Sequence, residues 1–242
     1  MLLFPNFSLR RSAYWATSPR AKESTVRLSG VMNAARSLAL KMADSFYDGE
    51  RTAQTDLVNG LINSATDLLN TTYDDIHVFG GHQSSDPPYE IDGNGAMVYN
   101  GDSGQMQLDL SDGGRGFVTV NPEDNFNGNG GGENILQLLI DLRDQMQANS
   151  QAGVGATLNR FELAVSQLSR TASEIGTHYQ QIDVHDGINE VQDVELERLR
   201  STIEDTNYAE AATNMTMRQT AYQASLAATA RVQSLSLLSF MR

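Results

Sequence analysis

A heptad repeat in the second half of the chain restricts the fold more than any other sequence feature. Its apolar residues are spaced alternately by four and three positions, which places them in one seam along a helix. The seam consists of Phe161, Val165, Leu168, Ala172, Ile175, Tyr179 and Ile182. The repeat is interrupted over residues 183–187 and resumes with Ile188, Val191, Leu196, Leu199 and Ile203. Because one helix cannot bury such a seam by itself, we expect a bundle in which a partner helix covers it.

An earlier zone of the chain can supply the partner helix. Residues 25–72 also repeat apolar residues every three or four positions, with a short break at Tyr47-Asp48-Gly49. The repeating residues are Val31, Ala35, Leu38, Met42, Ala53, Leu57, Leu61, Ala65 and Leu68. Since the two helical zones flank a different region, they meet only as an antiparallel pair. We therefore expect the Leu57–Leu68 stripe to face the Phe161–Ile182 stripe.

The region between the helical zones has the pattern of β-hairpins. Residues 80–132 hold 13 of the 20 glycines, and short alternating runs lie between clusters of Asn, Asp and Gly. The predicted strands are Tyr89–Ile91, Met97–Tyr99, Met106–Leu110 and Phe117–Val120. The segment Asp92-Gly93-Asn94-Gly95 is similar to the start of a calcium loop. Ala96 and Ser103 stand where two further ligands are needed, so we interpret the segment as a hairpin turn.

The order of these zones predicts a fold that is mainly α with a small β insertion. The expected architecture is a long antiparallel helical bundle that carries a β-hairpin subdomain. The expected divisions are an unstructured leader at 1–23, a long N-terminal helix at 24–79, the β-rich insertion at 80–132, a helical bundle return at 133–204 and a C-terminal assembly helix at 205–242.

The charge balance excludes several classes of function. The formal net charge is −13, yet residues 1–41 carry about +6 and the rest of the chain −19. An acidic body disfavours nucleic acid, whose phosphates need a cationic surface, and is repelled by anionic membranes. No apolar run is long enough to span a membrane. The chain has no cysteine, which excludes disulfides and thiolate metal sites.

Few side chains are arranged for catalysis or metal binding. His77 and His82 lie near Asp74 and Asp75 in the sequence, but a metal site needs three or four converging ligands. His178 and His185 lie two turns apart, the spacing of a solvent-facing helix stripe. We expect no enzyme, no cofactor and no metal site. A small metal-dependent enzyme that uses His77 and His82 is the alternative from another class.

The C-terminal region has a composition that differs from the rest of the chain. Residues 207–242 contain one acid and three bases, and small or uncharged side chains fill most other positions. An exposed helix of a monomer normally has a charged face, so this region predicts an interaction helix that is buried in an assembly. An ordinary buried helix of a single domain is the alternative. The expected interface residues are Tyr208, Met215, Tyr222, Leu226, Val232, Leu235 and Leu238.

Several segments resemble the bacterial flagellin superfamily. Leu199–Glu210, Tyr222–Ala230 and Leu235–Phe240 are similar to the family's C-terminal helical part. Leu69–Tyr73, Val78–Gly81, Pro87–Tyr89 and Tyr99–Gly104 resemble its hook-associated protein 3 branch. Residues 1–23 depart from the N-terminal helix of the family. From this departure we expect a truncated, frameshifted or wrongly started copy.

The resemblance implies a flagellin-like bundle and a structural role at the junction of hook and filament. It further implies secretion to the flagellum, self-assembly, flagellin and hook-associated protein 1 as neighbours, and an export chaperone that holds the C-terminal helix. No nucleic acid and no membrane is expected as a partner. A filament flagellin and a non-functional fragment are the other possibilities.

Overall fold

The computed structural model describes residues 5–93, 95–105, 107–111, 114–117, 119–204 and 208–240. Within these ranges, the side chains of residues 5–18, 108–111, 114–116, 204 and 234–240 are not described. The chain divides into two compact units, residues 1–187 and residues 188–242, and each unit is described by itself.

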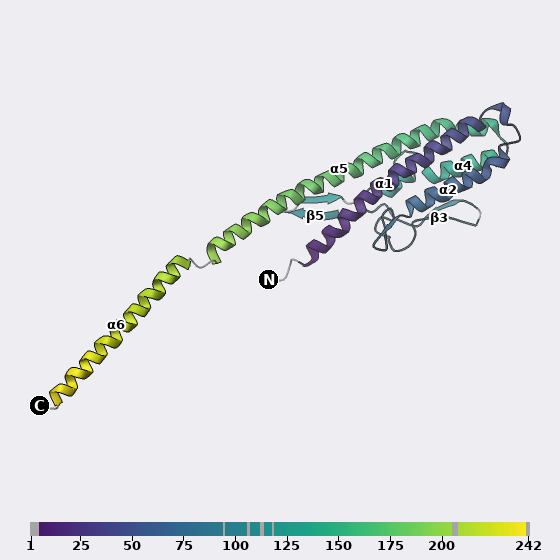
Figure 1. The fold of residues 1–242 in the computed structure, drawn as a ribbon. Helices are drawn as coiled ribbons and strands as arrows, with labels where there is room; N and C mark the ends of the chain where they lie inside the picture. The colour runs from purple at the N-terminus through teal and green to yellow at the C-terminus, as the bar shows by residue number, and fades with distance from the viewer. Residues whose placement is uncertain are drawn as a thin grey trace. The chain divides into compact units, whose positions relative to one another are not determined.

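Four helices build the first unit (Figure 1). They are α1 (Pro5–Met42), α2 (Thr55–Leu69), α4 (Ile135–Gln147) and α5 (Gln151–Glu204), the last of which continues into the second unit. A short helix, α3 (Pro122–Phe126), precedes α4 and is capped by Asn121, whose side chain accepts a hydrogen bond from the Glu123 amide. The second unit contains the end of α5 and α6 (Tyr208–Phe240). The mainly α fold that the sequence predicts is confirmed.

Helix α4 buries a broad apolar face, whereas Gln137, Asp141 and Asp144 lie on its other side. Its buried side chains are Ile135, Leu136, Leu138, Leu139, Ile140, Leu142 and Met146. An apolar face as wide as this is stable only when other elements cover it. Helix α2 packs against both α4 and α1.

The heptad seam of α5 lies in the core of the first unit. Phe161, Leu168, Ile175 and Ile182 are buried, whereas Val165, Ala172 and Tyr179 are half-buried. Two contacts show that α1 and α5 are antiparallel. Arg36 donates a hydrogen bond to Glu162 at 3.4 Å, and Gln151 donates to the carbonyl of Ala43 at 2.9 Å. The predicted seam is therefore covered by a helix, with α1 as the antiparallel neighbour.

The predicted pairing of the Leu57–Leu68 stripe with this seam is wrong. Leu57 is 57% exposed, and the buried face of α2 consists of Val58, Ile62, Ala65 and Leu69. The predicted and observed faces overlap, since Ala65 is buried and Leu61 and Leu68 are half-buried against the core. The stripe is directed away from α5 because α2 packs against α1 and α4.

Residues 24–79, predicted as one long helix, contain two helices and a hairpin. Helix α1 ends at Met42, and two single-turn 3-10 helices, Ser45–Tyr47 and Thr52–Gln54, join it to α2. Gly49 has a φ of +85°, which ends helical geometry between them. The predicted unstructured leader at 1–23 also differs, because α1 is already helical from Pro5. Proline is favoured at the first position of a helix, where its missing amide hydrogen is not needed.

A buried arginine holds together the connection between α1 and α2. We call residues 43–54 the bundle tip. The Arg51 side chain is 1% exposed and donates from Nε to the Met42 carbonyl at 2.6 Å. It also donates to the Asp44 carbonyl at 2.9 Å and to Asn149 Oδ1 at 3.0 Å. Since Asn149 lies between α4 and α5, this one guanidinium links both turns at this end of the bundle.

Three two-stranded antiparallel sheets occur in the described ranges. They pair β1 (Thr72–Tyr73) with β2 (Ile76–His77), β3 (Tyr89–Ile91) with β4 (Met97–Tyr99), and β5 (Gln107–Ser111) with β6 (Gly114–Phe117). The predicted turn between β3 and β4 is confirmed, with Gly95 at a φ of +79°. The strand predicted at Phe117–Val120 instead ends at Phe117, because β6 pairs back onto β5 at once.

Two side-chain amides tie the β region to the helices. Asn70, at the end of α2, donates to the Tyr89 carbonyl at 2.7 Å and accepts from the Tyr89 amide at 2.9 Å, as a neighbouring strand would. Gln167 on α5 donates to the carbonyls of Asn125 and Glu133 at 2.9 and 3.0 Å and accepts from the Glu133 amide at 2.8 Å. The β region therefore enters and leaves the bundle at fixed points.

Within the described residues, the helices were compared with the length and hydropathy that a membrane-crossing helix requires. None of them satisfies both conditions.

Candidate assembly surface

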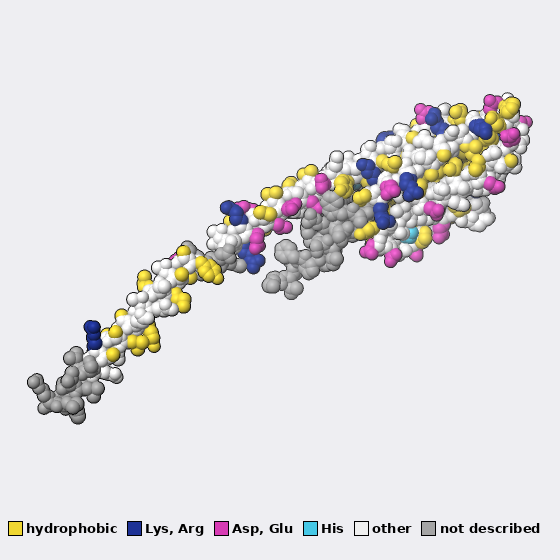
Figure 2. All heavy atoms as spheres, viewed as in Figure 1, with side chains coloured by type: hydrophobic (Ala, Val, Ile, Leu, Met, Phe, Trp, Pro, Cys, Tyr) yellow, Lys and Arg dark blue, Asp and Glu magenta, His cyan; other side chains and the backbone are white. Residues whose placement is uncertain are grey.

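Helix α6 exposes every side chain that is described on it. Residues 208–233 are all exposed, including Tyr208 at 89%, Tyr222 at 67% and Met215 at 62%. Figure 2 shows hydrophobic and uncharged side chains along most of this helix, and charged ones are sparse. Large apolar side chains are costly to leave in water at this density, which is typical of a surface that a partner covers.

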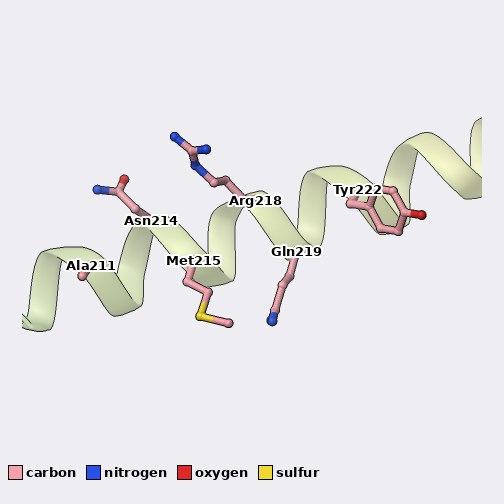
Figure 3. Close-up of a pocket in the computed structure, with 6 residues that line it drawn as sticks. All are labelled: Ala211, Asn214, Met215, Arg218, Gln219 and Tyr222. Carbon is pink, nitrogen blue, oxygen red and sulfur yellow. The ribbon is translucent and has the colours of Figure 1, made fainter.

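Four of the predicted interface residues share one face of α6. Tyr208, Met215, Tyr222 and Leu226 are separated by seven, seven and four positions, which brings them to one side of a helix. In Figure 3, Met215 and Gln219 point to one side of α6, and Asn214 and Arg218 point to the other. A shallow open hollow lies along this stretch, between Ala211 and Tyr222.

The remaining predicted interface residues have different positions. Val232 is 66% exposed but lies off the shared face. The side chains of Leu235 and Leu238 lie outside the residues that the structure describes. Met217 was not predicted, although it is 65% exposed on the face opposite Met215. The second unit therefore presents apolar groups on more than one side of α6.

The end of α5 carries further exposed apolar residues that the sequence interpretation assigned to the bundle. Val191, Leu196 and Ile203 are 70%, 63% and 83% exposed. Leu196 and Ile203 are in heptad register with the buried Ile175 and Ile182, and Asn189 occupies the position between the two pairs. The repeat itself was visible in the sequence. Its periodicity does not show which turns of the helix are covered and which are exposed.

Three of the four histidines, His77, His82 and His178, lie in separate local contacts. His77 Nδ1 lies 3.0 Å from the Asn70 carbonyl, and the amide of His82 donates to Asp102 Oδ1 at 2.8 Å. The ring of His178 packs near Phe117. Among the described residues, no group of three or more His, Asp or Glu side chains is arranged to hold a metal ion.

In the purified monomer, we expect the amides of residues 208–233 to exchange hydrogen faster than those of residues 161–182. The second segment is buried in the bundle, whereas the first has no packed face and depends on local helix stability alone. Hydrogen exchange followed by mass spectrometry measures both segments in one sample. Equal strong protection of the two segments in a verified monomer would contradict this expectation.

The region that contains this surface also matches a protein-family model. Residues 164–241 match the model of the bacterial flagellin C-terminal helical region. A search of curated proteins by sequence returned no match. The family match begins in the buried seam of α5 and extends through α6.

Comparison with solved structures identifies the fold. A flagellar hook-associated protein-3 from Legionella pneumophila is similar with a TM-score of 0.69 and 12% identity, over 83% of this chain and 97% of that one. A putative flagellar hook-associated protein from Vibrio parahaemolyticus has a TM-score of 0.64 and 19% identity, over 82% and 94%. FlgL from Bacillus cereus has a TM-score of 0.63 and 17% identity, over 76% and 88%.

These findings confirm the resemblance stated from the sequence. The similarity to flagellin is carried by sequence over residues 164–241. The similarity to the hook-associated proteins is carried by the fold, at identities below 20%.

Proposed function

We propose that this chain is a structural subunit of the bacterial flagellum at the junction of hook and filament. The observation that carries the proposal is a fold shared with hook-associated proteins over most of both chains, joined to a C-terminal helix that exposes uncharged and apolar side chains. The role is positional, and the chain acts by packing against neighbouring subunits rather than by catalysis.

The exposed surface of α6 provides a driving force for such packing. Burying one Tyr, Met or Leu side chain contributes about 1.5–3 kcal/mol. Residues 208–233 include one acid, Glu210, and two bases, Arg218 and Arg231, so few ions need to be desolvated. Small residues such as Ala211 and Ala212 allow close approach of a second helix. Copies of one chain that use unlike surfaces form rings or helical arrays.

The proposal includes partners and a location. The chain assembles with itself, with flagellin on one side and with hook-associated protein 1 on the other, outside the cell. Before secretion, an export chaperone covers the C-terminal helix. The apolar side chains of α6 support this part of the proposal, because such a surface aggregates when it is left uncovered.

Deletion of the gene in the source bacterium tests the function. We expect the deletion strain to build hooks and to release flagellin into the medium, because filament growth lacks its junction. Complementation by the gene should restore filaments, and Tyr222→Glu with Leu226→Glu should not, since two charges then enter the packed surface. The matched control is His82→Ala, whose ring is largely exposed and which should complement fully.

The same strain separates the junction role from that of a filament flagellin. A filament subunit would leave little or no flagellin in the medium after deletion of its gene. Immunoblots of the medium and electron microscopy of the hooks therefore distinguish the two roles. Normal filaments in the deletion strain would exclude both the junction role and the filament-subunit role.

A further inference from the structure

The bundle tip presents an aromatic side chain away from the core. Phe46 is 83% exposed, although its backbone is held firmly. Its amide donates to Asp44 Oδ1 at 3.0 Å, and its ring meets the edge of the Tyr47 ring at a centroid distance of 5.3 Å. The buried Arg51 holds the same loop by its hydrogen bonds to the Met42 and Asp44 carbonyls. An exposed aromatic ring on a rigid backbone is typical of anchor residues in protein interfaces.

A groove lies near the other end of the same bundle. It has a volume of about 750 Å³ and lies between α1 and α5. Pro19 and Lys22 line it from α1, and Ile175, Gly176 and Tyr179 line it from α5. Gly176 leaves it open, because only the end of the Lys22 side chain, at 3.7 Å, approaches the place of a Cβ atom. The groove is large enough for one phenylalanine ring.

The charges around the two features are complementary. The tip exposes Asp44, Asp48 and Glu50, and Lys41 lies just before it near the end of α1. The groove is lined by Lys22 and Asp183, so Lys22 suits the acidic tip and Asp183 suits Lys41. Along α1, Lys22 and Met42 are about 30 Å apart at 1.5 Å per residue, so one copy cannot make this contact with itself.

We propose that Phe46 of one copy inserts into the α1–α5 groove of a second copy of this chain. The contact joins unlike ends of the bundle, so it repeats and stacks copies end to end along the bundle axis. The inference rests on the proposed assembly role, but it assigns a contact to the first unit and not to α6.

Disulfide trapping between two purified full-length chains tests the contact. The chain has no cysteine, so one cysteine in each chain reports one pair of positions. Ser45→Cys, beside Phe46, is mixed with a size-tagged Ser173→Cys chain, whose cysteine lies at the groove. The control mixture pairs Ser64→Cys on the exposed side of α2 with the same Ser173→Cys chain. We expect roughly tenfold more mixed disulfide than in the control, as burial of one aromatic ring provides.

Two further substitutions remove the contact without removing the cysteines. Phe46→Ala, added to the Ser45→Cys chain, deletes the ring. Gly176→Leu, added to the Ser173→Cys chain, fills the groove and favours the helix, so that chain folds at least as well. Each should reduce the mixed disulfide to the control level, with unchanged thermal unfolding by circular dichroism.

A mixed disulfide at the control level, or one that both substitutions leave unchanged, overturns the proposed contact. Neither result affects the gene-deletion phenotype, which depends on the proposed function and not on the tip. Conversely, normal filaments in the deletion strain would contradict the proposed function but would not affect the disulfide-trapping result. The two experiments therefore fail separately.

Discussion

Replacing Leu168 by aspartate is expected to unfold the bundle of the first unit. Leu168 is fully buried in the seam of α5, and its loss alone costs about 2–5 kcal/mol. The new carboxylate adds a desolvation cost of several kcal/mol, since no cation among the buried residues lies beside it. Together these costs equal or exceed the stability of a typical domain. Thermal unfolding followed by circular dichroism measures the change.

Leu163→Asp is the matched control for this substitution. Leu163 lies on the same helix and is 57% exposed, so its replacement should change the free energy of unfolding by only about 0.5 kcal/mol. If Leu168→Asp and Leu163→Asp melt at the same temperature, the seam is not a core.

Replacing Arg51 by methionine is expected to destabilise the bundle by about 2–4 kcal/mol, because several hydrogen bonds from a charged donor to buried acceptors are lost. Methionine keeps the apolar stem but removes the donor to the Met42 carbonyl, and it leaves the Asp44 carbonyl and Asn149 Oδ1 only the longer hydrogen bonds from the Tyr47 and Gly49 amides, at 3.3 and 3.5 Å. The salt bridge to Asp48 contributes little to this figure, because the Asp48 side chain is 74% exposed. Urea denaturation of the variant and of the unsubstituted chain gives the difference.

Arg36→Met provides the comparison for Arg51. Arg36 also joins two helices, through Glu162 at 3.4 Å, but the two side chains are 48% and 71% exposed. Exposed ion pairs contribute about 0–1 kcal/mol, so this variant should be close to the unsubstituted chain. A cost at position 51 as small as that at position 36 would mean that water replaces the buried arginine's contacts.

Much of the architecture follows from periodicity in the sequence. The α5 seam, the helix at Ile135–Gln147 and the hairpin of β3 and β4 depend on local patterns that only one structure satisfies. The face of α2 was predicted only in part: Ala65 is buried as expected, but Leu57 is exposed and Val58 is buried, and only the neighbouring helices decide between these two apolar residues. Local sequence carries no record of those neighbours.

Neither the buried contacts of the bundle tip nor the exposure of the apolar end of α5 could be predicted from the sequence, for different reasons. Arg51 has no neighbour in the sequence that marks it as buried, since its partner Asn149 is 98 residues away. The end of α5 has the same repeat as the core, and only the folded structure separates the covered turns from the exposed ones. For α6, the low charge of the sequence predicts an interaction helix, and four of the residues named for its interface share one face; their role at an interface stays a prediction.

The paired anchors at Asn70 and Gln167 make the β region a place where the chain can change in size. Tyr89 and Glu133 are held to the helices whatever lies between them. The entropy of closing a loop rises only with the logarithm of its length, so doubling the segment between the anchors costs about 0.6 kcal/mol. Among the residues that the structure describes, β5 and β6 form a two-stranded sheet of their own, so an insert between Ser111 and Gly114 extends that hairpin. The β region can therefore gain or lose residues, up to a whole domain, while the contacts of Asn70 and Gln167 with the helical bundle stay as they are.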